Sequence, residues 1–122
     1  MSYETLNSEN TLTESTCQVN LQVFIIEQDR QMIAYCPALD LSTYGESEDD
    51  VRTAFDEAVE IFLSDSLQNQ SLERSLLKMG WTLMRHNYIP PKNIQPTVIL
   101  SEYPGSILRA QILSSISLPT ID

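Results

Sequence analysis

The sequence predicts one mixed α+β domain, in which a three-stranded antiparallel sheet carries a packed helix, a second short helix and a fourth strand. Apolar and polar residues alternate from 17 to 26, and a polar turn and a second β-type run follow. Between residues 51 and 62, apolar residues recur every three or four positions, as on one face of a helix. A chain of 122 residues is long enough for one such domain with a hydrophobic core.

The first strands form a hairpin. Val19, Leu21 and Val23 share a face of the strand over 17–26, residues 27–31 form a polar turn, and residues 32–36 return. Pro37 lacks a backbone donor and ends this second strand. Residues 41–44 predict a short third strand. Gly45 after it allows a backbone geometry that other residues resist.

Two helices and a last strand complete the predicted domain, which spans residues 17–86. Ser47 and Asp50 have the spacing of a capping box, so a helix is expected over 48–64. Its apolar face packs on the sheet, and its opposite face is acidic. A second helix over 71–80 ends at Gly80, and residues 81–86 form the fourth strand. The residues of the acidic face are Asp49, Thr53, Asp56 and Glu60.

The two ends of the chain lack this regularity. Residues 1–16 are polar and read as a flexible leader, and residues 87–122 read as an irregular, proline-punctuated C-terminal arm without a recognisable DNA-binding module. Residues 97–100 are strand-like, whereas 106–113 fit a short helix or a strand equally well. The apolar side chains of the arm either complete this domain's own core or contact a second copy or another partner. They are Val98, Ile99, Leu100, Ile112 and Leu113.

Composition limits the function classes. The chain has 17 acidic and 7 basic residues and a net charge of −10. This balance argues against direct nucleic-acid binding, and it suits either a basic partner or simple solubility. No membrane-spanning run or signal peptide is evident, so the cytoplasm is expected. There, the two cysteines, Cys17 and Cys36, would remain thiols. One histidine and two distant cysteines predict no metal site and no cofactor.

The sequence does not predict an enzyme. Cys36 has no histidine nearby in the sequence. It is therefore interpreted as a small buried residue of the hairpin rather than as a nucleophile. His86 is interpreted as a residue of a loop or an edge strand rather than as a catalytic base. Nothing in the spacing of the loop carboxylates brings them together as a two-metal nuclease site requires.

One segment resembles a known family. Residues 34–39 (Ala-Tyr-Cys-Pro-Ala-Leu), the Tyr44-Gly45 pair, the acidic cap over 47–50 and the helix after it resemble HicB-like antitoxins of toxin–antitoxin systems. The resemblance covers residues 18–84. It implies a partial ribonuclease-H-like fold and a protein that neutralises a small basic HicA-type ribonuclease by covering its active site. The family's usual Pro-Gly after the corner is replaced here by Asp40-Leu41.

The resemblance and the charge together give the expected binding residues. Asp40 and Tyr44 lie on the corner loop and the strand after it, and Asp49, Asp56 and Glu60 lie on the acidic helix face. In the alternative hypothesis, the chain is an orphan scaffold domain that dimerises through the C-terminal arm and meets no toxin.

Overall fold

The computed structural model describes residues 15–120 and confirms a mixed α+β fold with a four-stranded antiparallel sheet. The strand order is β3-β2-β1-β6. Of the predicted leader, residues 1–14 lie outside the described residues, and residues 15 and 16 already belong to the first strand. The strands are β1 Ser15–Gln28, β2 Gln31–Cys36, β3 Leu41–Gly45 and β6 Ile107–Thr120.

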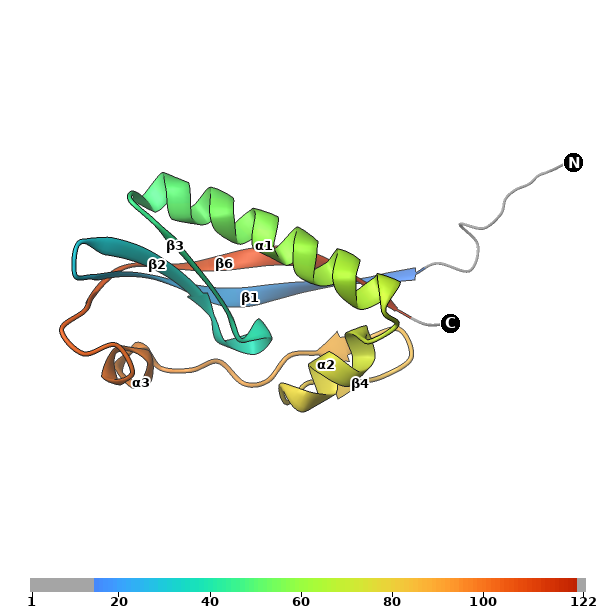
Figure 1. Cartoon of the computed structure of the whole chain (residues 1–122). Helices are drawn as coiled ribbons and strands as arrows, with labels where there is room; N and C mark the ends of the chain where they lie inside the picture. The colour runs from blue at the N-terminus through green and yellow to red at the C-terminus, as the bar shows by residue number, and fades with distance from the viewer. Residues whose placement is uncertain (1–14, 121–122) are drawn as a thin grey trace, which may run out of the picture.

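Helices lie on both faces of the sheet (Figure 1). The long helix α1, Glu48–Gln68, crosses one face, and the short helix α2, Leu72–Lys78, contributes to the same core. The helix α3, Pro96–Ser101, lies on the opposite face. Between α2 and α3, the short strands β4, Thr82–Leu83, and β5, Tyr88–Ile89, pair as a separate ribbon.

The β1–β2 hairpin has a tighter turn than the sequence indicated. Gln28 pairs with Gln31, so only Asp29 and Arg30 form the loop. Both have positive φ angles, 52° and 67°, as a type I′ turn requires. The polar residues 27, 28 and 31 were assigned to the turn from composition, but they belong to the strands.

The corner after β2 is a single 3-10 turn, η2, Pro37–Leu39. Asp40 follows it in the left-handed region with φ 49°, and its N–H donates to the Pro37 carbonyl at 3.1 Å. The indole Nε1 of Trp81 donates to the Ala38 carbonyl at 2.7 Å. A buried side chain that follows α2 therefore holds the corner in place.

Gly80 ends α2 as predicted, and Ser47 forms its own half of the predicted capping box. Ser47 is the N-cap of α1, and its Oγ accepts the Asp50 N–H at 3.1 Å. After α2, Gly80 has φ 93°. The N–H groups of Trp81 and Gly80 donate to the carbonyls of Leu76 and Leu77, both at 3.1 Å, which is the Schellman pattern.

Gly45 is required for a reason that the sequence did not indicate. Its φ angle is not among the positive ones, so it does not adopt an unusual backbone. A Cβ at this position would lie 3.0 Å from the Val51 nitrogen and 3.2 Å from the Val51 Cα. The glycine therefore permits the end of β3 to lie close against the first turn of α1.

The fourth strand was predicted in the wrong place. Residues 81–86 contribute only the two-residue strand β4, outside the main sheet. The strand that completes the sheet is β6, which pairs with β1 from Ser15↔Thr120 to Glu27↔Ile107. The predicted irregular arm therefore contains a long strand that pairs with β1. This pairing is favoured because its register buries Ile116 and Leu118.

A second, smaller core lies under α3. Residues 97–100 were expected to be strand-like, but they are helical. Ile99 is buried there against Phe24, Ile26 and Ile33. The Gln22 side chain fixes the preceding segment, because its amide donates to the Ile94 carbonyl at 3.1 Å and accepts the Ile94 N–H at 2.8 Å. The chain thus crosses the second face of the sheet before it enters β6.

Candidate functional site

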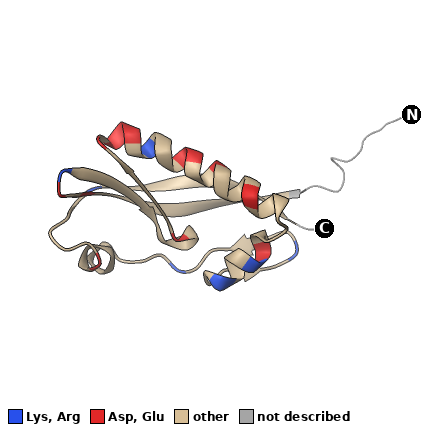
Figure 2. Ribbon diagram, viewed as in Figure 1, with Lys and Arg blue, Asp and Glu red and all other residues tan. Residues whose placement is uncertain are grey.

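The outward face of α1 is acidic along its length (Figure 2). Asp49, Asp56 and Glu60 are all exposed. At about 100° per residue they lie within about 40° of one another around the helix axis. The helix has one basic residue, Arg52, and Glu48 pairs with it at 2.9 Å. The predicted acidic stripe therefore exists, and its negative charge is not balanced within α1.

A groove runs between this stripe and β6. Its first part has a volume of about 290 Å³ and is lined by Arg52, Phe55 and Asp56 of α1, by Ile112 of β6 and by sheet residues beneath them. A second hollow continues it past Val59 and Glu60. The two share Asp56, Ser114 and Ser115, so they form one α1–β6 groove. The apolar residues beneath its first part are Val23, Ile25 and Ala34.

The groove brings together two sets of predicted residues that lie far apart in the sequence. Asp56 and Glu60 were assigned to partner binding, whereas Ile112 and Leu113 were assigned to contacts of the arm. Ile112 is partly buried against the main core. Leu113 is 66% exposed, and strand alternation places its side chain on the opposite face of the sheet. Leu113 therefore lines the groove mainly through its backbone.

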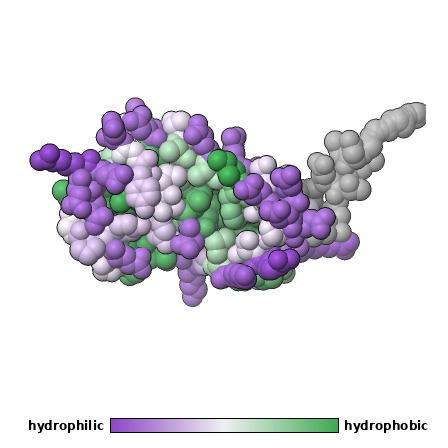
Figure 3. Space-filling model, viewed as in Figure 1, coloured by the Kyte–Doolittle hydropathy of each residue, from purple (hydrophilic) through white to green (hydrophobic). Residues whose placement is uncertain are grey.

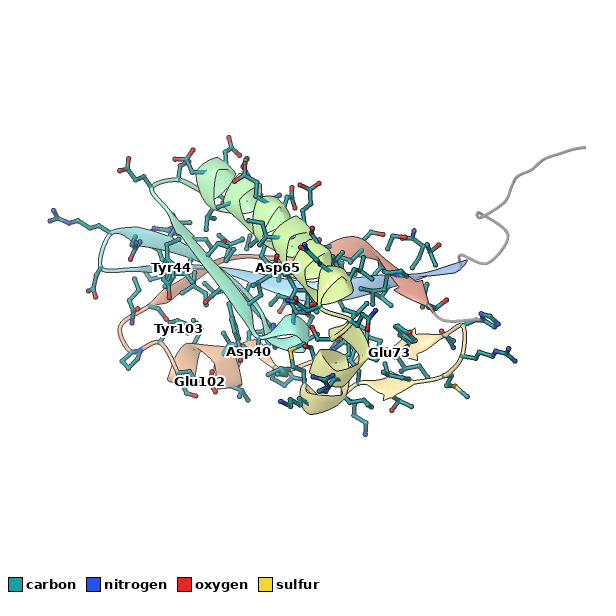
Figure 4. All side chains as sticks on the ribbon, turned by 45° about the vertical axis from the view of Figure 1, so that its right-hand side comes forward. Asp40, Tyr44, Asp65, Glu73, Glu102 and Tyr103 are labelled. Carbon is teal, nitrogen blue, oxygen red and sulfur yellow. The ribbon has the colours of Figure 1, made fainter. Side chains whose placement is uncertain are left out.

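The other predicted binding residues lie on a different surface. Thr43 faces α1, since its Oγ1 donates to the Val51 carbonyl at 3.2 Å. Tyr44, the next residue, therefore points to the opposite face. Asp40 and Tyr44 lie near Glu102 and Tyr103, which the turn after α3 supplies (Figure 4). The structure thus separates Asp40 and Tyr44 from the acidic stripe of α1.

This second surface, the tyrosine patch, is formed by Tyr35, Asp40, Tyr44, Glu102 and Tyr103. The rings of Tyr35 and Tyr103 lie 6.1 Å apart between centroids and are tilted by 59°. Burial, followed by the charge of Asp40, raises the pKa of Tyr35. Burial, followed by Tyr44, raises the pKa of Tyr103. Sequence reasoning missed Glu102 and Tyr103, because only the packing of α3 on the sheet brings them near β2 and β3.

The residues of the predicted arm have different environments. Ile99 is buried in this chain's own second core, and Leu100 packs against that core. Val98, on the same helix, is 49% exposed.

Hydrophobic residues gather in the middle of one face of the molecule, and hydrophilic residues follow the outer edge of α1 (Figure 3).

The possible nucleophile and base differ in their exposure to solvent. Cys36 is fully buried in the main core, and Cys17 is also buried and free. His86 is exposed in the connection between β4 and β5. Among residues 15–120, no group of three or more His, Cys, Asp or Glu side chains is placed to hold a metal ion. None of the helices between residues 15 and 120 has the length and hydropathy of a membrane span.

Burial raises the pKa of Cys36 to about 11, from an ordinary value of 9.0. The folded protein therefore holds this proton more tightly than the unfolded chain does. We expect the free energy of unfolding to fall by about 2 kcal/mol as the pH rises from 9 to 11, because ionisation favours the unfolded chain. Urea unfolding at pH 8.5 and pH 11 measures the fall. In a Cys36→Ala variant, the free energy of unfolding should fall less over the same pH range, because the thiol is absent. An equal fall in both proteins would show that Cys36 is not its cause.

No protein-family model, curated protein or solved structure matches this chain.

Proposed function

We propose that this protein is a HicB-like antitoxin, which binds a small basic HicA-type ribonuclease in a stoichiometric complex and masks its RNA-binding surface without a cofactor. The observation that carries the proposal is the α1–β6 groove, which combines an apolar floor with a wall that carries Asp56 and Glu60. Arg52 also lines this wall, but its charge is paired with Glu48. The motif resemblance over residues 18–84 and the net charge of −10 support the same proposal. In this proposal, the sheet and helices form the family's partial ribonuclease-H-like domain.

The physical basis of the proposed complex is charge and shape together. A ribonuclease that binds RNA carries lysine and arginine on the surface that contacts phosphate. The Asp49, Asp56 and Glu60 stripe attracts such a surface and speeds the encounter. The apolar groove beside the stripe supplies buried contact area, which gives a complex its lifetime. Masking of this kind needs no catalytic residue in the antitoxin.

The alternative function is a scaffold domain that homo-oligomerises through its C-terminal residues. The observation in its favour is that β6 lies at an edge of the sheet and that Leu113 on it is 66% exposed. A pull-down from native cells at low salt distinguishes the two functions. A small basic protein in near-equal amount, released by salt, supports the antitoxin. Recovery of the bait alone, as a dimer, supports the scaffold.

The acidic wall gives a specific prediction. We expect the double variant Asp56→Asn/Glu60→Gln to bind the co-purified basic protein about tenfold more weakly at 50 mM salt, and to lose most of the salt dependence of binding. The matched control is Glu57→Gln/Asp65→Asn, which removes the same charge from α1 outside the groove lining. Calorimetry at two salt concentrations measures both. Equal weakening by the two double variants would show that only net charge matters.

A further inference from the structure

The strand β6 presents an open edge. It is the last strand in the order β3-β2-β1-β6, and it pairs with β1 on one side along its whole length. No other strand among residues 15–120 pairs with its outer side. A strand in this position carries a row of backbone N–H and C=O groups that can pair with an added strand.

The hairpin turn shows which of these groups point outward. Gln28 and Gln31 flank the two-residue turn, so they form a hydrogen-bonded pair, and even-numbered residues at that end of β1 bond to β2. Odd-numbered residues of β1 therefore bond to β6, where their partners from Ala110 to Leu118 are even-numbered. The outward amides of β6 are consequently those of Gln111, Leu113, Ser115 and Ser117.

The middle of this edge lacks the features that usually prevent strand addition. Edge strands are protected by charges, prolines and bulges. In β6, these features stand at the ends: Arg109 lies at the irregularity in the β1 pairing, where it also pairs with Glu27, and Pro119 lies near the other end. Residues 110–118, Ala-Gln-Ile-Leu-Ser-Ser-Ile-Ser-Leu, contain neither a charge nor a proline.

The α1–β6 groove determines what kind of strand fits. Alternate side chains of a strand added to β6 would lie on the α1 side, beside Ile112 and Ile116 and below Asp56 and Glu60. Arginine and lysine suit these positions, because the aliphatic stem covers apolar surface while the cation reaches a carboxylate. The groove's own cation, Arg52, is paired with Glu48, which leaves Asp56 and Glu60 for the added strand. A partner segment that suits this edge is therefore extended and has a basic side chain at every second residue.

A second copy of this chain fits the edge less well. Antiparallel pairing of β6 with β6 about a two-fold axis keeps both α1 helices on the same face of the joined sheet. The Asp56 and Glu60 stripes of the two copies would then face each other across the combined groove. Like charges in that arrangement repel.

We propose that β6 binds an extended basic strand of the partner by strand addition at its outer edge, with the arginine or lysine side chains of that strand in the α1–β6 groove. This inference rests on the proposed function and specifies its binding mode. It predicts that the outward amides of residues 110–118, rather than the helix surface alone, determine affinity.

The test uses the full chain and a synthetic blocked peptide, Arg-Val-Arg-Val-Arg-Val-Arg, at 50 mM salt. We expect the peptide to slow amide hydrogen exchange at Gln111, Leu113, Ser115 and Ser117, as measured by NMR. Ser115→Pro removes one outward donor and should weaken binding at least tenfold by fluorescence anisotropy. The matched control is Ser42→Pro, since Ser42 is exposed on β3 at the other edge and its N–H points outward by the same pairing rule.

Each outcome decides the proposal. Binding lost only in Ser115→Pro, with protection on β6, supports strand addition. No binding, equal binding by both proline variants, or protection confined to α1 overturns it. A wild-type dimer whose β6 amides are protected before peptide is added, and which Ser115→Pro dissociates, also overturns it in favour of a second copy. If the co-purified basic protein binds Ser115→Pro normally, the antitoxin function stands and only the strand-addition mode fails.

Discussion

Deleting residues 107–122 is expected to leave a chain that does not fold cooperatively. The deletion removes β6, which pairs with β1 over the length of that strand and buries Ile116 and Leu118. Burial of two such side chains contributes about 1.5–3 kcal/mol each, and each ladder hydrogen bond contributes about 0.5–1.5 kcal/mol. Their sum reaches the entire stability of about 5–15 kcal/mol that is typical of a small domain.

The measurement is urea unfolding of the truncated chain, followed by far-UV circular dichroism, together with the amide dispersion of its NMR spectrum. A matched pair of point variants avoids the ambiguity of a deletion. Leu118 is fully buried and Leu113 is 66% exposed, although both are leucines of β6. Leu118→Asp should unfold the protein or nearly so, because it buries a charge, whereas Leu113→Asp should cost less than about 1 kcal/mol. Equal tolerance of both would show that β6 is a loose arm.

Replacing Trp81 with alanine is expected to lower the free energy of unfolding by about 3–5 kcal/mol. The indole is 3% exposed in the main core, and it holds the η2 corner through its hydrogen bond to the Ala38 carbonyl. The variant loses apolar contact and also leaves that carbonyl without its partner. The corner and the start of β3 should therefore loosen together.

Trp81→Phe separates the two contributions, because phenylalanine retains most of the apolar contact but has no donor. We expect this variant to lower the free energy of unfolding by about 1–3 kcal/mol, which is less than the alanine variant does. Chemical denaturation followed by far-UV circular dichroism gives both values. A loss below about 1 kcal/mol for Trp81→Ala would mean that neither the packing nor the hydrogen bond of the indole stabilises the corner.

The candidate site was predictable in part. Asp49, Asp56 and Glu60 were identified as one helix face, because helical periodicity alone places them there. That Asp56 and Glu60 border an apolar groove was not predictable, since β6 supplies the other wall. Tyr44 was identified by its position near the corner, but its neighbours Glu102 and Tyr103 were not, because they reach it through the packing of α3.

Local chemistry specifies several parts of the fold, and these parts were predictable from the sequence alone. The β1–β2 hairpin follows from alternation around a polar turn, the start of α1 from the Ser47 cap, and the end of α2 from Gly80. Each of these depends on residues that are close together in the sequence.

The fourth strand, the position of α3 and hence the groove depend on packing between distant parts of the chain. Apolar residues alternate in β6 from Ile112 to Leu118, but Ser114 interrupts them and Pro119 follows, so the pattern also fits a loop. The register with β1 selects the strand, because it places Ile116 beside Val19 and Leu118 beside Cys17 in one core. Pairing between residues so distant in the chain has no local signature, since its free energy comes from burial that exists only after the sheet has formed.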